Sequence, residues 1–229
     1  MQTEERQTNP DTNDVPFITV SFPVQGKQLP ADHGYLLYAA ITKHVLSLHR
    51  APWLGVELIS GVPWDKGVIA LPTRSASLRL RLPADKFAHV LHLAGARLEL
   101  DSYALRLGLP VARPLVSASS LYARIVTIKK FTEPEPFLDA AYRQLAQLDI
   151  TGTLELPHDG RTRSRRIITI HGRKVVGFSL AVHSLSDADS IKLQSVGLGG
   201  RRAMGCGMFN PIVKALWTQE EDGAETQEA

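Results

Sequence analysis

The chain has 229 residues, of which 44% are hydrophobic and 21% are charged, a composition typical of a globular protein with one large domain or two small ones. It has no apolar run near the roughly 20 residues of a membrane-spanning helix, and its polar, acidic N-terminus lacks the features of a secretory signal. A single cysteine excludes an internal disulfide and argues against a cysteine-based zinc site. We therefore expect a protein of the reducing cytoplasm, with no membrane partner.

The net charge of +3 conceals an uneven distribution of charged residues. Residues 1–14 contain four acidic residues and one basic residue, and residues 218–229 contain five acidic residues and no Lys or Arg. The rest of the chain therefore holds 25 basic and 14 acidic residues, a net charge of about +11. This pattern predicts two disordered acidic tails attached to a body that binds a polyanion, such as nucleic acid.

The first half of the chain predicts strands and helices in alternation. Residues 17–24 are rich in β-branched and aromatic side chains, and residues 30–49 carry apolar residues at helical spacing. Residues 77–83 (SLRLRLP) alternate strictly, which predicts a strand with leucines on one face and Arg79 and Arg81 on the other. The other elements expected here are short strands at 56–60 and 67–71, a helix at 83–95 and a strand or hairpin at 97–107.

The second half repeats this order, which favours an α+β fold of two tandem ferredoxin-like (βαββαβ) domains. Ser186, with Asp189 three residues later, marks the start of its last helix. Strands are expected at 121–129, 151–156, 165–171, 175–183 and 208–214, with helices at 135–148 and 184–197. The domain boundaries that we predict are a tail at 1–14, domains at 15–112 and 113–217, and a tail at 218–229.

The glycine-rich segment VGLGGRRAMGCGMF, residues 196–209, resembles nucleotide-binding loops but matches none of them. A dinucleotide-binding loop needs a glycine where Arg202 stands, and it follows a strand rather than a helix. A P-loop needs Lys and then Ser or Thr where Cys206 and Gly207 stand. We expect two roles together: the backbone N–H groups, Arg201 and Arg202 bind phosphate, and the segment is a tight connector between a helix and a strand.

A metal site has little support in the sequence. His89 and His92 lie three residues apart on a predicted helix and could share a face, but no third ligand accompanies them at a telling spacing. We expect them to lie on the surface of that helix, and we expect no metal and no other cofactor.

Basic residues form several clusters. Arg161, Arg163, Arg165 and Arg166 crowd a predicted hairpin, Lys129 and Lys130 close a strand, and Arg79 and Arg81 share a strand face. Charges that protect edge strands explain one such cluster but not all of them. Because only 7% of the residues are aromatic, a stacking platform for long single strands is disfavoured, and backbone contact with folded RNA fits better.

The glycine-rich segment also has the form G-h-G, five residues that include two arginines, and G-h-G again. This arrangement resembles the glycine-rich signature near the C-terminus of the RAMP superfamily of CRISPR-associated proteins. Within it, the chain resembles the "Cas six" family of repeat-RNA (pre-crRNA) processing endoribonucleases of the MYXAN-type type I group. The stretches that carry the resemblance are VSFPVQGKQLPADHGYLLYAAI, RSASLRLRLP and GLGGRRAMGCGMF, so that it spans nearly all of residues 15–215.

The resemblance implies two RRM-like ferredoxin folds that recognise the CRISPR repeat hairpin. It implies metal-independent cleavage, in which the 2′-hydroxyl of the repeat attacks the scissile phosphate and leaves a 2′,3′-cyclic phosphate. It also implies partners: precursor and guide RNA, and other subunits of a type I effector complex. Two alternatives remain open, a non-catalytic RAMP subunit that only binds guide RNA and an unrelated two-domain RNA-binding module.

The resemblance places the catalytic histidine at or after the first helix, which makes His49 the first candidate, His33 the second and His44 a helix-surface residue. Tyr38 resembles a tyrosine that assists catalysis in the family, although a core aromatic is an equal alternative. In one continuous helix Tyr38 and His49 would lie about 16 Å apart, so they can share a phosphate only if the helix ends near Val45 and the chain folds back. The RNA-binding residues that we predict are Gly197, Gly199, Gly200, Arg201, Arg202, Gly205, Gly207, Arg161, Arg163, Arg165, Arg166, Lys129 and Lys130.

Overall fold

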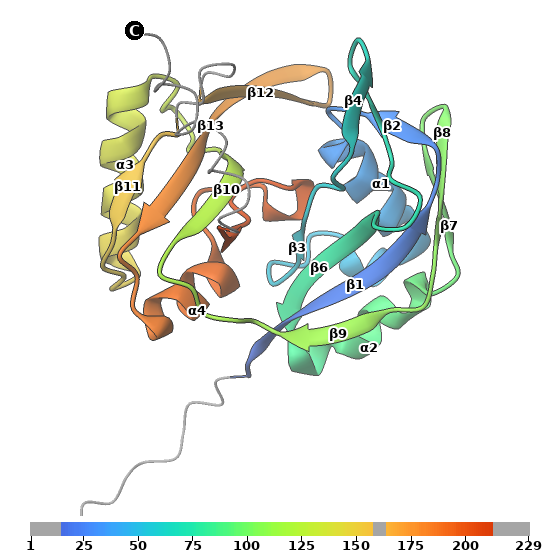
Figure 1. Ribbon diagram of the computed structural model, residues 1–229, viewed down its shortest axis with the longest axis horizontal. Helices are drawn as coiled ribbons and strands as arrows, with labels where there is room; N and C mark the ends of the chain where they lie inside the picture. Colours follow the sequence, from blue (N-terminus) through green and yellow to red (C-terminus); the bar gives the residue numbers. More distant parts are fainter. Residues whose placement is uncertain (1–14, 158–163, 213–229) are drawn as a thin grey trace, which may run out of the picture.

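The computed structural model describes residues 15–157 and 164–212 as an α+β fold with two main antiparallel sheets (Figure 1). A third, three-stranded sheet accompanies the first of them. In these residues no helix is both long and apolar enough to cross a membrane. The two predicted tails lie outside the described residues, as do residues 158–163, which include Arg161 and Arg163.

The N-terminal sheet has the strand order β3-β6-β1-β8-β7, with β9 pairing along β1. Its first four members reproduce the ferredoxin-like order, in which the first strand lies between the third and the fourth. The small sheet β2-β5-β4 is added to this frame. The elements are β1 Phe17–Gln25, β2 Gln28–Pro30, α1 Gly34–His44, η1 Leu46–Leu48, β3 Gly55–Val56, β4 Val62–Asp65, β5 Val68–Ala70, β6 Ser77–Pro83, η2 Ala84–Lys86, α2 Phe87–Val90, η3 Leu91–Leu93, β7 Arg97–Leu100, β8 Tyr103–Leu107 and β9 Val111–Pro114.

The C-terminal sheet has the order β11-β13-β10-β14, again the ferredoxin-like order, and β12 forms a hairpin with β13. The two predicted ferredoxin-like halves are therefore confirmed. Ser186 accepts a hydrogen bond from the Asp189 N–H at 3.1 Å and so begins α4 as expected. The elements are β10 Leu121–Val126, α3 Pro134–Gln147, β11 Thr153–Glu155, β12 Arg165–Ile170, β13 Arg173–His183, α4 Asp187–Val196, η4 Arg202–Met204 and β14 Asn210–Pro211.

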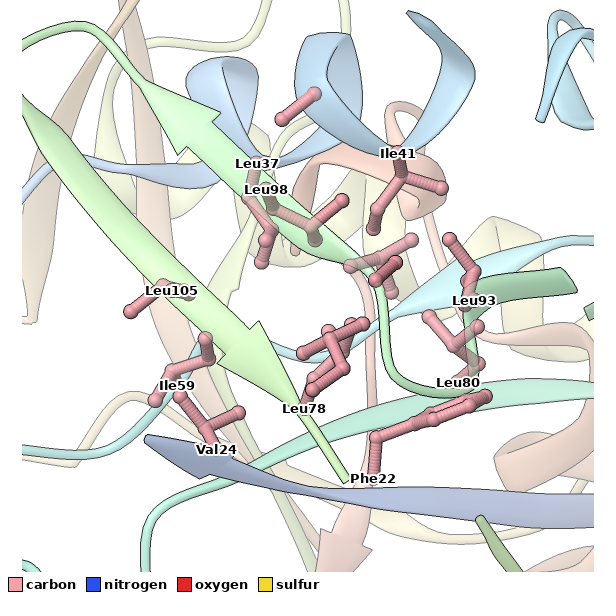
Figure 2. Packing of buried hydrophobic residues seen from close by; sticks show 14 of the residues in the cluster. Phe22, Val24, Leu37, Ile41, Ile59, Leu78, Leu80, Leu93, Leu98 and Leu105 are labelled. Carbon is pink, nitrogen blue, oxygen red and sulfur yellow. The ribbon is translucent and has the colours of Figure 1, made fainter. Parts of the chain in front are cut away.

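The core of the N-terminal half lies between its sheet and helix α1 (Figure 2). The alternation of β6 places Leu78 and Leu80 here, fully buried, together with Phe22 of β1. Leu37 and Ile41 of α1 are also fully buried in this cluster, because they lie four residues apart on one face of the helix. A second cluster fills the C-terminal half, where Phe137 of α3 packs against Phe178 of β13 at a ring-centroid distance of 4.7 Å.

The two arginines on the other face of β6 have different environments. Arg79 is exposed, but Arg81 is only 2% exposed. Its guanidinium lies at the junction of the two halves, where Nη1 donates to the carbonyl oxygens of Gln194 and Phe209 at 3.0 and 2.6 Å. Nη2 donates to the Glu57 carboxylate at 2.7 Å. Desolvation by burial lowers the pKa of the Arg81 guanidinium, although the charge of Glu57 acts in the opposite direction. Arg81 therefore joins the two domains instead of facing solvent.

The predicted helix at 83–95 is shorter and more irregular than its pattern indicates. Only Phe87–Val90 is α-helical, and 3₁₀ turns precede and follow it. Gly95 has a φ of +73°, which agrees with the predicted stop at this glycine.

Candidate active site

The first helix ends where the pairing of Tyr38 with His49 requires. Helix α1 stops at His44, Val45 is extended, and a single 3₁₀ turn, η1, leads to His49. The chain thus folds back on the helix, and the ring of His49 stacks on that of Tyr38 with centroids 6.2 Å apart and planes inclined by 24°. The predicted fold-back near Val45 is confirmed.

Tyr38 holds this turn through its hydroxyl group. The hydroxyl oxygen accepts a hydrogen bond from the backbone N–H of Arg50 at 3.0 Å, and Arg50 has a φ of +56°, in the left-handed region. Tyr38 is buried, whereas His49 is exposed. The two interpretations of Tyr38 are therefore compatible: it is a core aromatic whose polar end fixes the backbone beside an exposed imidazole.

His33, the second catalytic candidate, has the environment of a structural residue. Its ring is fully buried, Nδ1 lies 2.8 Å from the Pro30 carbonyl oxygen, and Nε2 accepts the Ile59 N–H at 3.0 Å. These contacts require a neutral ring with the proton on Nδ1, and burial is the main cause that lowers its pKa from the ordinary value of 6.5. With both nitrogens engaged inside the protein, His33 connects the start of α1 to the segment after β3.

The buried His33 predicts a loss of stability in mild acid. The unfolded chain binds a proton at this residue below about pH 6.5, whereas the folded chain does so only at lower pH, so that stability falls as pH drops below that value. His33→Gln keeps one donor and one acceptor but does not titrate. We expect urea unfolding between pH 7.5 and 5 to show a weaker pH dependence for this variant than for the wild type. Equal slopes would show that other groups cause the acid sensitivity.

The backbone N–H groups of the glycine-rich segment are used inside the protein, so they are not available to a phosphate. Those of Gly197, Gly200, Gly205 and Gly207 donate to the carbonyl oxygens of Leu193, Thr127, Arg202 and Ile125, and that of Gly199 donates to the side chain of Gln144. The donor–acceptor distances lie between 2.8 and 3.1 Å. The expectation of a phosphate cradle built from these N–H groups is wrong.

The glycines are instead required by close packing. A Cβ on Gly197 would lie 2.3 Å from the Gly207 carbonyl oxygen, and one on Gly207 would lie 2.1 Å from the Leu198 carbonyl oxygen. Both have φ near +67°, so a side chain would be both strained and obstructed. On the other side of the segment, η4 packs against α1, where Gly34 leaves room for the Met204 carbonyl. The segment therefore supports the helix that carries Tyr38.

The two adjacent arginines of this segment have different environments. Arg201 is exposed, with φ at +66°, and its Nη1 lies 3.3 Å from the Thr127 hydroxyl. Arg202 is half-buried, its Nη2 donates to the Ser195 carbonyl, and burial followed by the charge of Arg81 lowers its pKa to about 10. Of the two, Arg201 is the one that a phosphate can reach readily.

The basic hairpin β12–β13 extends over the start of α1 (Figure 1). The Thr169 N–H donates to the Asp32 carboxylate at 2.6 Å, and the Tyr35 hydroxyl lies 3.1 Å from His171 Nδ1. Arg165 and Arg166, being adjacent on β12, face opposite sides of the hairpin. Lys129 and Lys130 are exposed in the turn after β10.

A cleft of about 610 Å³ lies between the two sheets, with residues of β6 on one side and of β10 on the other. Its lining includes Arg79, Arg124 and Arg166. An adjoining hollow of about 640 Å³ shares Arg79 and adds Arg74 and Arg113. The acidic residue of the lining, Glu57, is already bonded to the buried Arg81 and lies 3.5 Å from Arg79. The cleft is therefore strongly positive.

Arg124 and Arg166 both line this cleft and also a smaller hollow, to whose lining Asp32 contributes. Arg166 donates from Nε to the Ser179 hydroxyl at 3.0 Å. Desolvation, and next the charge of Arg166, lower the pKa of Arg124. An anion between the two guanidinium groups would relieve their repulsion, so the pair is suited to bind a phosphate or a carboxylate.

The predicted histidine pair on the second helix does not form a metal site in the described residues. His89 is exposed and its ring tilts against Trp53 at a centroid distance of 5.8 Å, and His92 is exposed on η3. Nowhere in residues 15–157 and 164–212 do three or more His, Cys, Asp or Glu side chains converge as metal ligands would.

Comparison with known proteins assigns the family. The family model described as Cas6 Crispr matches residues 18–214. The CRISPR-associated endonuclease Cas6 of Myxococcus xanthus (strain DK1622) is 40% identical over 208 residues, which cover 91% of this chain and 87% of that protein. The chain belongs to the Cas6 family.

Solved structures agree with this assignment at the level of the fold. A CRISPR-associated Cas6 protein superposes with a TM-score of 0.64 and 14% identity, over 86% of this chain and all of that one. A Cas6-related protein from Pyrococcus furiosus superposes with a TM-score of 0.61 and 13% identity, over 86% of this chain and 98% of that one. The tandem ferredoxin-like architecture is thus shared across Cas6 sequences that have diverged widely.

The cleft arginines include residues that the sequence pattern of this Cas6 chain did not single out. Arg74, Arg113 and Arg124 come from a loop, from β9 and from β10, and none lies in a run of basic residues. Only the topology brings them to the cleft and its adjoining hollow. The signal present in the sequence was the excess of positive charge over the whole body, which gives no position.

Proposed function

We propose that this chain is an endoribonuclease that binds CRISPR repeat RNA and cleaves it to produce guide RNAs. The observation that carries the proposal is its 40% identity, over 91% of its length, to a protein named as a CRISPR-associated endonuclease. The exposed His49 at the fold-back of α1 and the positive cleft support it. A RAMP subunit that only binds RNA does not need an imidazole positioned in this way.

The proposed reaction is an intramolecular transesterification. The 2′-hydroxyl oxygen attacks the adjacent phosphorus, the bond from phosphorus to the 5′-oxygen breaks, and the products carry a 2′,3′-cyclic phosphate and a 5′-hydroxyl. The 2′-hydroxyl loses its proton to a base, and the leaving 5′-oxygen receives one from an acid. A histidine with a pKa near 6.5 suits either role, and we assign one of them to His49. Because the attacking and leaving groups both belong to the RNA, we propose that no metal takes part.

In this proposal Tyr38 is a positioning residue. Its hydroxyl oxygen accepts the Arg50 N–H, and its ring lies against that of His49. Both contacts restrict the imidazole to one side of the turn. Orientation of this kind accelerates proton transfer because the reacting groups need not search for each other.

We propose two groups of residues for RNA binding. The first is a set of exposed basic residues of the C-terminal half, namely Arg165 on β12, Arg201, Lys129 and Lys130, which would contact the phosphates of the repeat hairpin. The second is the cleft, where Arg124 and Arg166 would hold an unpaired stretch of the same RNA. The further partners expected from the resemblance, subunits of an effector complex, stay a prediction.

Cleavage of a repeat RNA in EDTA tests the chemistry. We expect the same rate with and without the chelator, and we expect a 2′-deoxy nucleotide at the cut site to abolish cleavage but leave affinity unchanged, because that substitution removes only the nucleophile. Product ends are identified by mass spectrometry, which distinguishes a cyclic phosphate. Loss of activity in EDTA would contradict a metal-independent reaction. Tight binding without any cleavage would instead favour the RNA-binding subunit.

A further inference from the structure

The smaller hollow, of about 160 Å³, lies between the two domains at the start of helix α1. It shares Arg124 and Arg166 with the positive cleft, and its lining adds Asp32 and Tyr35 from the start of α1. The C-terminal half contributes residues of β10, β12 and η4 to the same lining. The hollow is therefore formed by the docking of the two domains.

The lining of the hollow combines apolar residues with polar groups of opposite charge. Its apolar members are Leu58, Ile125, Ile168 and Met204. The Asp32 carboxylate is an acceptor, whereas the guanidinium groups of Arg124 and Arg166 are donors. A phosphate there would be repelled by Asp32, but a neutral nucleobase has apolar faces and carries donors and acceptors along one edge. The hollow thus suits a base better than a phosphate.

Asp32 and Tyr35 are held in place by the hairpin β12–β13 of the other domain. Oδ2 of Asp32 accepts the Thr169 N–H at 2.6 Å, which uses one of the roughly four lone-pair sites of a carboxylate. The Tyr35 hydroxyl lies 3.1 Å from His171 Nδ1, and the two ring centroids are 4.5 Å apart. Both side chains are therefore positioned before a ligand binds, and the carboxylate can still accept further hydrogen bonds.

We propose that this hollow holds one unpaired nucleobase of the RNA and selects guanine. The Watson–Crick edge of guanine places the O6 acceptor beside the N1–H and N2–H donors, so Asp32 accepts from the two N–H groups and Arg124 donates to O6. Adenine and cytosine each offer one amino group beside a bare ring nitrogen, and uracil offers one N–H between two carbonyl oxygens, so the carboxylate repels part of each edge. The inference rests on the proposed function and adds a base preference to it.

The hollow lies one helical turn from the proposed catalytic pair. Tyr35 and Tyr38 are three residues apart on α1, and side chains at this spacing are neighbours on a helix. The ring of His49 stacks on that of Tyr38. A guanine in the hollow therefore belongs to a nucleotide close to the cleaved phosphate, and its binding helps to fix where the RNA strand is cut.

Fluorescence anisotropy with labelled single-stranded RNA tests the base preference. The probes are short oligouridylates that carry guanosine, inosine, adenosine, cytidine or uridine at one central position. We expect the guanosine probe to bind about tenfold more tightly than the uridine probe, because a bidentate contact to a base discriminates by about this factor. Inosine lacks the N2 amino group and should bind with intermediate affinity, whereas adenosine and cytidine should stay close to uridine. Equal binding of all the probes, or of none, would overturn the proposal.

Two substitutions and a matched control test the residues. Asp32→Asn keeps an oxygen for the Thr169 N–H but replaces the other acceptor with a donor, so it should abolish the preference for guanosine. Arg124→Gln should weaken the same preference, so that the result does not depend on one variant. Glu99→Gln, exposed on β7, removes the same charge as Asp32→Asn and should keep the full preference.

The variants and the cleavage reaction separate this inference from the proposed function. A preference for guanosine that survives in Asp32→Asn, or that Glu99→Gln loses equally, would overturn the base site. Failure of the wild type to cleave the repeat RNA would instead contradict the proposed endoribonuclease, because the anisotropy measurement does not depend on cleavage.

Discussion

His49→Ala is expected to slow cleavage of the repeat RNA by about 10²–10⁴-fold while the affinity for the RNA stays close to that of the wild type. The imidazole is exposed at the turn after α1, and its contact inside the protein is the stack on Tyr38. Its removal therefore leaves the core intact and removes only proton transfer. Single-turnover rates at saturating protein separate this effect from binding.

His44→Ala is the matched control for this prediction. His44 is also exposed, and it is the last residue of α1, but it lies on the other side of the extended residue Val45. We expect this variant to cleave at nearly the wild-type rate. Added imidazole should partly restore His49→Ala, since a free base can occupy the emptied space. A near-normal rate for His49→Ala would remove this residue from the mechanism.

Tyr38→Phe distinguishes positioning from proton transfer. The variant keeps the stacked ring but loses the acceptor for the Arg50 N–H, so the turn should loosen. We expect Tyr38→Phe to cleave more slowly than His44→Ala and faster than His49→Ala. The pH dependence of its cleavage rate should match that of the wild type. A shift of that profile would mean that the phenol itself exchanges a proton with the substrate.

The sequence predicted most of the strands and helices because these depend on local patterns, whereas the fold-back near Val45 was expected only from the resemblance that pairs Tyr38 with His49. The alternation of β6 and the helical spacing of α1 are properties of neighbouring residues, and the Ser186 cap is satisfied within three residues. The length of the helix predicted at 83–95 was overestimated, because its apolar spacing also suits the 3₁₀ turns that flank α2.

The sequence could not predict the role of residues whose partners are distant in the chain. Arg81 is buried because its acceptors, including the Gln194 and Phe209 carbonyls, come from the other half, 113 and 128 residues away. The Nε2 atom of His33 is not free for catalysis, because it accepts the N–H of Ile59, 26 residues away in the chain. The glycine-rich segment has the composition of a phosphate loop, but only the fold shows that its N–H groups have protein acceptors.

The polar contacts of Arg81 give the largest expected effect on stability. Its Nη1 bonds two backbone carbonyls, and its Nη2 bonds Glu57 and the Asn210 side chain at 2.7 Å each, so four groups lose a partner when it is removed. Removing one member of a buried ion pair typically costs about 3–5 kcal/mol, because the other charge is left buried and unpaired. We expect Arg81→Met to lose about that amount, measured by urea unfolding at pH 7.5.

Two comparisons show whether this loss comes from burial rather than from charge. Arg79 approaches the same Glu57 at 3.5 Å, but its side chain is 52% exposed, and Arg79→Met should therefore cost less than about 1 kcal/mol. Arg81→Met combined with Glu57→Gln should be more stable than the sum of the two single changes predicts, because the double variant leaves no buried carboxylate without a cation. Since the contacts of Arg81 join β6 to α4 and to the start of β14, its loss should also uncouple the unfolding of the two halves. A single cooperative transition of unchanged midpoint would show that the two domains hold together without it.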